Sequence, residues 1–321
     1  MKKTLLLICS IGVLPLTMCQ QTNHDLMPAG TLQASVPQAD AMLQQAKTHI
    51  AQGRYGNAKS VLESLLTTYR YAPCAAEARF TLAEVCEKRN MPRDAFEEYE
   101  KVVTMYPSSP LYQKSIERQL SLAMAAAEGK LKVGVMGLWK SSLDSETVQK
   151  WLGSVIRNAP YNDLAATAAS ILGKYLVQEE EYEKAVAVYT QLVEKYPTSR
   201  YAPEAQLMVA QLWASSRTRG DQNMANLQRA QEAYEEFTLR FPRHPEAGKA
   251  LAEASNVRRL LVQQELEAGR FYLERSHEYT SAVFCFENVI RQKNVNPDAA
   301  KEAETLLKRA RAAKAATTSA R

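Results

Sequence analysis

The stretch "YEKAVAVYTQLVEKYP", residues 182–197, decides the fold expected for this chain. A small residue is followed by an aromatic residue four positions on, by apolar residues at seven and eight, and by proline at twelve: Ala185, Tyr189, Leu192, Val193 and Pro197. Offsets of four, seven and eight lie on one face of an α-helix, so the stretch predicts an amphipathic helix that buries one stripe. Proline ends such a helix because it lacks an N–H donor and clashes with the preceding turn.

The same pattern recurs around five further positions. Clear copies are anchored at Ala95, Ala230 and Ala282, and weaker ones at Ala58 and Val148. The copy at Ala58 has Arg70 where the others favour proline. Successive anchors are 37, 53, 37, 45 and 52 residues apart, which predicts six related units along the chain.

A small anchor, an aromatic residue four later, a proline twelve later and Gly173 twelve before Ala185 together resemble the tetratricopeptide repeat, a helix-turn-helix unit of about 34 residues. The resemblance implies an all-α fold, an α-solenoid superhelix of about six tetratricopeptide-like repeats. Every spacing exceeds the length of that unit, so we expect inserted loops or longer helices, chiefly in residues 127–146 and 215–227. We expect repeats 1–2 in 41–125, an insertion with repeats 3–4 in 126–215, and repeats 5–6 with a basic terminal helix in 216–321.

The segment "YPTSRYAPEA", residues 196–205, is nearly copied at 69–78 and has the features of a joint between units. Pro197 ends one helix, and Pro203 stands where the first turn of the next helix tolerates a missing N–H. We interpret the copies as structural joints between repeat units rather than as a ligand-binding motif.

The N-terminus has the pattern of an export signal. Lys2 and Lys3 precede an apolar stretch from Leu5 to Leu16, which is too short for a membrane span. Residues 1–18 are therefore predicted to be a signal peptide of the lipoprotein type, with Cys19 as the lipidated residue and 19–40 as a flexible tether. Met18 stands where Gly, Ala or Ser is usual, so an ordinary cleaved signal is the alternative.

Residues that could perform catalysis or bind metal do not form a known motif. The histidines are scattered, with no metal-binding or nucleophile signature: His24, His49, His244 and His277. We expect Glu179-Glu180-Glu181 to be an exposed helical face. The sequence therefore predicts no enzyme, no cofactor and no metal site.

The cysteine spacing and the charge distribution also indicate no specific binding or redox motif. Cys74, Cys86 and Cys285 lack a Cys-x-x-Cys spacing, so free thiols are expected, with a Cys74–Cys86 disulfide as the alternative. The formal net charge of +5 is spread over helices of mixed sign, which does not favour nucleic acid. The basic segment 308–321 is expected to be a capping helix or a docking element for an acidic partner or anionic lipid.

Residues 229–292 resemble the BamD family, the lipoproteins of the outer-membrane β-barrel assembly machinery. The matching features, in chain order, are Phe241-Pro242, Arg258 or Arg259 with Leu261, Glu265, Phe271-Tyr272, Arg275, Tyr279 and Ala282. This match covers about a fifth of the chain, and six anchors are present where that family has five repeats.

The resemblance implies a non-catalytic scaffold that is lipid-anchored at the periplasmic face of the outer membrane. Its implied partners are the POTRA domains of a BamA-like β-barrel insertase and unfolded outer-membrane proteins, which would enter an N-terminal groove. The partner contact is expected to involve Arg259, Glu265, Phe271, Tyr272, Arg275 and Tyr279.

Other functions fit the same repeats. A periplasmic adaptor for cell-wall or division machinery would need neither the lipid nor the barrel partner. A helical lipoprotein of polysaccharide uptake is disfavoured, because Trp139, Trp151 and Trp213 do not cluster in the sequence as an aromatic sugar platform would. The aromatic and charged residues of the expected contact also fit a purely structural role in the repeat core and in surface ion pairs.

Overall fold

A computed structural model describes residues 36–135, 139–216 and 221–319. The expected signal peptide, Cys19 and most of the expected tether lie outside these residues. The chain divides into two compact units, Met1–Ser115 and Ile116–Arg321.

Unit 1 consists of antiparallel helices, and from α1 to α4 each helix packs on the next. They are α1 (Pro37–Ala51), α2 (Tyr55–Thr68), α3 (Ala75–Lys88), α4 (Pro92–Met105) and the first turn of α5 (Tyr112–Ala127). Because α1 begins at Pro37, the last residues of the segment 19–40 are helical rather than part of a tether.

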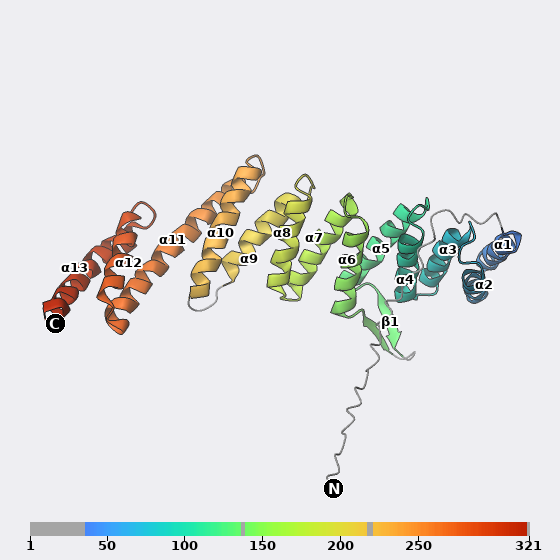
Figure 1. Ribbon diagram of the computed structural model, residues 1–321, viewed down its shortest axis with the longest axis horizontal. Helices are drawn as coiled ribbons and strands as arrows, with labels where there is room; N and C mark the ends of the chain where they lie inside the picture. The colour runs from blue at the N-terminus through green and yellow to red at the C-terminus, as the bar shows by residue number, and fades with distance from the viewer. Residues whose placement is uncertain (1–35, 136–138, 217–220, 320–321) are drawn as a thin grey trace, which may run out of the picture. The chain divides into compact units, whose positions relative to one another are not determined.

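Unit 2 is also helical, and from α6 to α13 successive helices pack on one another (Figure 1). After α5 come β1 (Lys132–Val135), β2 (Trp139–Ser142), α6 (Ser145–Asn158), α7 (Asp163–Gln178), α8 (Tyr182–Lys195), α9 (Ala202–Ser215), α10 (Asp221–Arg240), α11 (Ala247–Phe271), the π-helical turn η1 (Tyr272–Ser276), α12 (Tyr279–Arg291) and α13 (Pro297–Ser319). The chain is thus an all-α solenoid of tetratricopeptide-like repeats, as predicted.

The predicted anchors account for the packing of the second helix in each repeat. Ala58, Ala95, Ala185, Ala230 and Ala282 have no exposed surface, and Val148 is 1% exposed. An aromatic or aliphatic side chain four residues later is buried beside each anchor: Leu62, Tyr99, Leu152, Tyr189, Tyr234 and Phe286. The stripe at offsets of four, seven and eight is therefore the face that each second helix buries.

Proline is not what ends these helices. α2 stops at Thr68, ten residues after its anchor, although Arg70 occupies the proline position; α4 and α8 stop at the same offset with proline present. The joints after α2, α4, α6, α8 and α10 contain the same pair of backbone turns, as where Tyr196 O accepts from Ser199 N (3.0 Å) and Ser199 O accepts from Ala202 N (3.0 Å). These turns are repeated in the joint after α2, so the joint itself sets the helix end.

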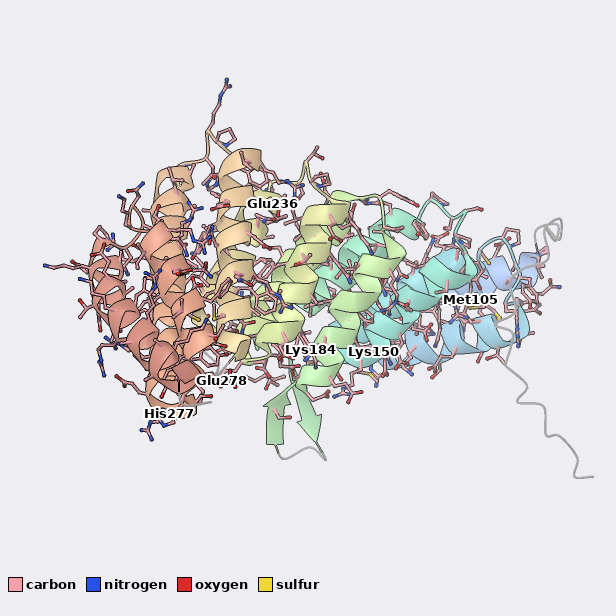
Figure 2. The ribbon with its side chains drawn as sticks, turned by 60° about the vertical axis from the view of Figure 1, so that its left-hand side comes forward. Met105, Lys150, Lys184, Glu236, His277 and Glu278 are labelled. Carbon is pink, nitrogen blue, oxygen red and sulfur yellow. The ribbon has the colours of Figure 1, made fainter. Side chains whose placement is uncertain are left out.

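In four of the six repeats, the turn between the two helices uses a left-handed residue five positions before the anchor. Gly53, Asn90, Glu180 and His277 have φ between 56° and 69°. The expectation of a helical face at Glu179-Glu180-Glu181 is therefore wrong, because α7 ends at Gln178 and these glutamates form the turn before α8. His277 and Glu278 lie in the corresponding turn between η1 and α12 (Figure 2).

Two kinds of insertion lengthen the repeats. Between α5 and α6 the chain forms an antiparallel hairpin in which Lys132 pairs with Ser142 and Val135 with Trp139, a structure that the helical pattern did not predict. The other long spacings arise mainly from longer helices, because α10 has 20 residues and α11 has 25. α10 begins at Asp221, so the excursion expected over 215–227 is mostly helix.

A π-helical turn accommodates one extra residue in the last repeat. Gly173 lies twelve residues before its anchor, whereas Gly269 lies thirteen before Ala282. Both glycines allow an aromatic ring of the next helix to approach closely, since a Cβ would lie 2.5 Å from the ring of Tyr189 and 2.6 Å from that of Phe286 respectively. η1 lies between Gly269 and the turn at His277, and it absorbs the additional residue.

α13 covers the exposed side of the last repeat. Its apolar stripe packs against α12 and α11 in a cluster that includes Leu266, Phe286, Ala303 and Leu306. Arg311 forms an ion pair with Glu287 of α12 (2.8 Å), so part of the basic segment is engaged within the chain. This arrangement is that of a capping helix, which a repeat array needs at its end.

Candidate functional site

A groove of about 590 Å³ lies on the first helices of the repeats in unit 1. It is lined by α1, α3, the start of α5 and the two joints between them: Lys47, Ile50, Pro73, Ala76, Glu77, Phe80, Thr81, Glu84, Ser109, Pro110, Leu111 and Lys114. This volume is within the range of small-ligand and short-peptide sites.

The middle of the groove is one face of α3. Glu77, Phe80 and Glu84 are three and four residues apart, which places them in a single row along the helix. Phe80 is 3% exposed and forms the apolar floor, while the two glutamates are exposed on either side of it along the axis. The row therefore presents a carboxylate, an aromatic ring and a second carboxylate in sequence.

Lysines from both flanking helices meet this row. Lys47 of α1 forms an ion pair with Glu77, with 2.6 Å between Nζ and Oε1. The ammonium group of Lys114, from α5, lies 4.7 Å from the centroid of the Phe80 ring. Because both contacts are at the surface, each contributes on the order of 0.5–1 kcal/mol.

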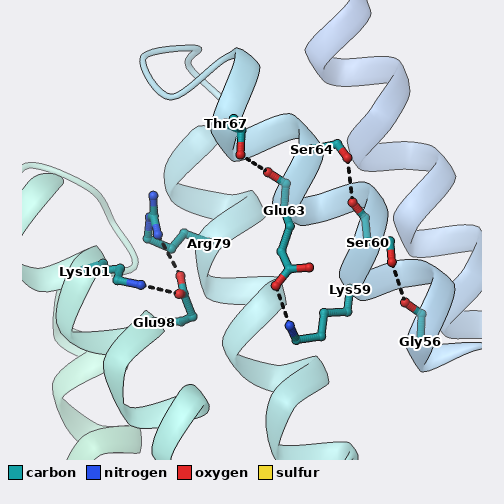
Figure 3. A network of polar contacts seen from close by, with 9 residues as sticks. All are labelled: Gly56, Lys59, Ser60, Glu63, Ser64, Thr67, Arg79, Glu98 and Lys101. Carbon is teal, nitrogen blue, oxygen red and sulfur yellow. Dashed lines mark hydrogen bonds and ion pairs between the residues drawn. The ribbon is translucent and has the colours of Figure 1, made fainter.

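An ion-pair network fixes α3 against α4 behind the groove (Figure 3). Arg79 donates to Glu98 over 2.7 Å, and Lys101 donates to the same carboxylate over 2.6 Å. The side chains of Arg79 and Glu98 are only 11% and 13% exposed. Removing one partner of such a pair would leave a largely buried charge, so the network constrains the position of α3.

The three cysteines of the described residues are not candidate nucleophiles. Cys74, Cys86 and Cys285 are free thiols. Burial raises the pKa of Cys74 and of Cys86 to about 11, so little thiolate is present at neutral pH.

No metal-binding cluster of histidine, cysteine or carboxylate side chains occurs among the described residues. None of the described helices combines the length and the apolar character needed to cross a membrane.

The residues predicted to contact a partner lie in the last repeat, and the structure brings together only some of them. Phe271 and Tyr272 are in edge-to-face contact, with ring centroids 5.9 Å apart. Arg275 follows in η1 and is exposed. Arg259 is also exposed, but it lies about 18 Å before Phe271 along α11 at 1.5 Å per residue.

The other predicted contact residues also have structural roles. Glu265 accepts hydrogen bonds from Asn288 (2.7 Å) and Gln292 (3.2 Å), which hold the end of α12 to α11. Tyr272 and Tyr279 are half-buried against the core cluster of this repeat. Phe271, by contrast, is 58% exposed. Of the predicted set, Arg259, Phe271 and Arg275 have most of their side chains available to another molecule.

The groove residues are not among those predicted from the sequence. The one feature of the sequence that indicates the groove is the row Glu77, Phe80 and Glu84, which lies beside the stripe that α3 buries against its neighbours. Lys47 and Lys114 are distant in sequence and reach the row only because α1 and α5 flank α3.

The fold and the groove define a class of protein, the interaction scaffold built from helix-turn-helix repeats. The particular repeat is the tetratricopeptide repeat, whose sequence profiles match residues 43–110 and 168–199. Proteins with this repeat bind protein partners in general. No curated protein matches the chain.

Solved structures of tetratricopeptide-repeat proteins resemble the chain at low identity. A repeat protein from Parabacteroides merdae is 12% identical, with a TM-score of 0.33, and the match covers 86% of this chain and 99% of that one. A thermophilic repeat protein from Thermus thermophilus is 20% identical, with a TM-score of 0.29, over 67% and 98% of the two chains. The TPR2AB domain of yeast Sti1, in a complex with pHSP90, is 14% identical, with a TM-score of 0.30, over 85% of each chain.

Proposed function

We propose that this protein is a non-catalytic scaffold lipoprotein of the machinery that assembles outer-membrane β-barrel proteins. Cys19 would carry the lipid and hold the chain at the periplasmic face of the outer membrane. The last repeat would bind the POTRA domains of a BamA-like insertase. The groove of unit 1 would receive extended segments of unfolded outer-membrane proteins, since a helical-repeat surface can hold an extended peptide.

The observation that supports the partner contact most directly is the exposure of Phe271. A phenylalanine side chain that is 58% exposed leaves most of its apolar surface in water, and burying it against a partner would be favourable. It lies beside exposed Arg275, and aromatic and arginine side chains are enriched where interfaces concentrate their binding energy. Both belong to the segment 229–292 that resembles the BamD family.

Affinity purification of the native protein tests the partner. We expect a POTRA-bearing barrel protein to be recovered with the chain, and expect Phe271→Ala to reduce that recovery. Phe284→Ala is the matched control, because Phe284 is equally large and 61% exposed on α12. Equal recovery with both variants would remove Phe271 from the contact. Recovery of cell-wall or division proteins without a barrel protein would favour the adaptor function instead.

Membrane fractionation with mass spectrometry of the mature N-terminus tests the lipidation of Cys19. We expect Cys19→Ala to move the protein from the membrane to the soluble fraction, because lipidation supplies the apolar surface for attachment. Cys285→Ala removes a thiol elsewhere and should leave the protein membrane-bound. A Cys19→Ala variant that stays in the membrane fraction would contradict the lipoprotein proposal.

A further inference from the structure

The groove of unit 1 contains four charged side chains, and only two of them neutralise each other. Lys47 and Glu77 form an ion pair across α1 and α3. Lys114 lies over the ring of Phe80, and Glu84 lies one helical turn further along α3. Within the part of the chain that the structure describes, neither Lys114 nor Glu84 has an oppositely charged partner.

These two groups are free to bind a ligand. The contact with the Phe80 ring uses the positive charge of Lys114 but leaves ammonium donors for an acceptor, since the group carries three N–H bonds. The Glu84 carboxylate can accept hydrogen bonds at both oxygens. Both side chains belong to exposed residues at the groove, so a ligand reaches them without displacing the core.

Phe80, the ring that Lys114 covers, and Glu84 are spaced along α3 like alternate residues of an extended chain. Phe80 and Glu84 are four residues apart on α3, which is about 6 Å along the helix axis. Side chains two residues apart on an extended peptide point to the same side and are separated by about 6.6–6.8 Å. An acidic and a basic residue at positions one and three of a peptide would therefore reach Lys114 and Glu84 together.

We propose that the groove selects a dipolar segment, defined as an acidic residue and a basic residue separated by one residue within an extended chain. The acidic side chain binds Lys114, the basic side chain binds Glu84, and the side chain of the residue between them points away from the groove floor. A segment with two acidic residues would place one of them against Glu84, which disfavours it. This inference rests on the proposed role of the groove in binding extended segments.

Fluorescence anisotropy with short labelled peptides tests the selection in the full chain. The dipolar probe is Gly-Asp-Phe-Lys-Gly-amide with an uncharged fluorophore on its N-terminus, and the neutral probe replaces Asp by Asn and Lys by Gln. Two further probes carry only one of these replacements. We expect the dipolar probe to bind about tenfold more tightly at low salt, from two partly exposed charge contacts. The difference should shrink at about 0.5 M salt, where such contacts are screened.

Matched variants assign each charge. Lys114→Gln should abolish the preference for Asp over Asn, and Glu84→Gln the preference for Lys over Gln, a loss of about threefold each. Lys150→Gln makes the same change on exposed α6 of unit 2 and should alter neither preference (Figure 2). All three positions are exposed, so the variants remain folded.

The outcomes separate this inference from the function on which it rests. Equal binding of dipolar and neutral probes, or unchanged preferences in Lys114→Gln, would overturn the charge selection while leaving peptide binding intact. Binding of none of the probes would overturn the peptide-binding role of the groove as well. A peptide with uncharged side chains and a free C-terminal carboxylate that binds as tightly as the dipolar probe would show that Lys114 binds a chain end instead, and would also overturn the inference.

Discussion

Two buried tyrosines at the same repeat position should respond oppositely to loss of their hydroxyl groups. Tyr99 and Tyr189 each lie four residues after an anchor, and their exposed fractions are 0% and 1%. Tyr99 donates a hydrogen bond to a carboxylate oxygen of Glu87 over 2.7 Å. The hydroxyl of Tyr189 is buried with no hydrogen-bond partner among the described residues.

The magnitudes follow from these environments. Tyr99→Phe removes a hydrogen bond to a charged acceptor and leaves the Glu87 carboxylate with one partner fewer, so the free energy of unfolding should fall by about 1.5 kcal/mol. Tyr189→Phe removes a polar group whose desolvation is uncompensated, and the free energy of unfolding should rise by about 1 kcal/mol. The ring that packs against Gly173 is unchanged, so no cavity opens.

Urea denaturation followed by circular dichroism measures both changes, and the slope of each transition reports whether the variants unfold alike. Because the two tyrosines lie in different units, hydrogen exchange of the amides in α4 and α8 locates each effect. The burial that leaves the Tyr189 hydroxyl without a partner also raises its pKa.

One result would refute the reasoning. If Tyr189→Phe destabilised the protein as much as Tyr99→Phe, the Tyr189 hydroxyl would have a hydrogen-bond partner in solution, and its burial would not be uncompensated. The expected pattern is a less stable Tyr99→Phe variant and a more stable Tyr189→Phe variant.

Three further predictions concern backbone, thiol and repeat spacing. Glu180→Gly should raise the free energy of unfolding, measured by urea denaturation, by about 1 kcal/mol, because φ of 61° strains a residue with a Cβ. A lower free energy of unfolding in this variant would show that the Glu180 side chain stabilises the protein by more than the strain destabilises it. Cys86 should react slowly with a thiol reagent at pH 8 and faster as the pH rises towards its pKa of about 11, while urea-unfolded protein should react at once; rapid labelling of the folded protein would contradict its burial. Deletion of Glu274 should change the urea midpoint of unfolding little, because η1 then becomes an ordinary helical turn. Deletion of Lys174 in α7 should lower this midpoint strongly, because it moves Gly173 out of register with Tyr189.

The sequence was sufficient to predict the repeat frame because the anchor and its stripe are determined locally. A small residue at Ala185 and apolar residues on one helical face can bury themselves only against adjacent helices, and the structure has them buried. The spacing between Gly269 and Ala282 also contained the signal for η1, since it is one residue longer than the spacing between Gly173 and Ala185.

The hairpin and the groove could not be predicted in the same way. β1 and β2 have four residues each, and their pairing lies outside the repeat pattern, so the helical period does not signal them. The groove depends on three helices: Glu77 meets Lys47 from α1, and Phe80 meets Lys114 from α5. Such contacts join residues about thirty positions apart, and no local pattern records them.

The buried anchor residues and the exposed groove residues differ in how much their replacement would cost in stability. The anchors are fully buried, so changing one opens a cavity or overpacks the core at a cost of about 1–5 kcal/mol. Lys114 and Glu84 are exposed, and replacing either should alter stability by less than about 0.5 kcal/mol. The residues that reveal the fold are therefore constrained, whereas those that would select a ligand can change almost freely. For this reason the repeat pattern identifies the architecture without identifying the partner, and the choice of partner must be tested at the groove and at Phe271.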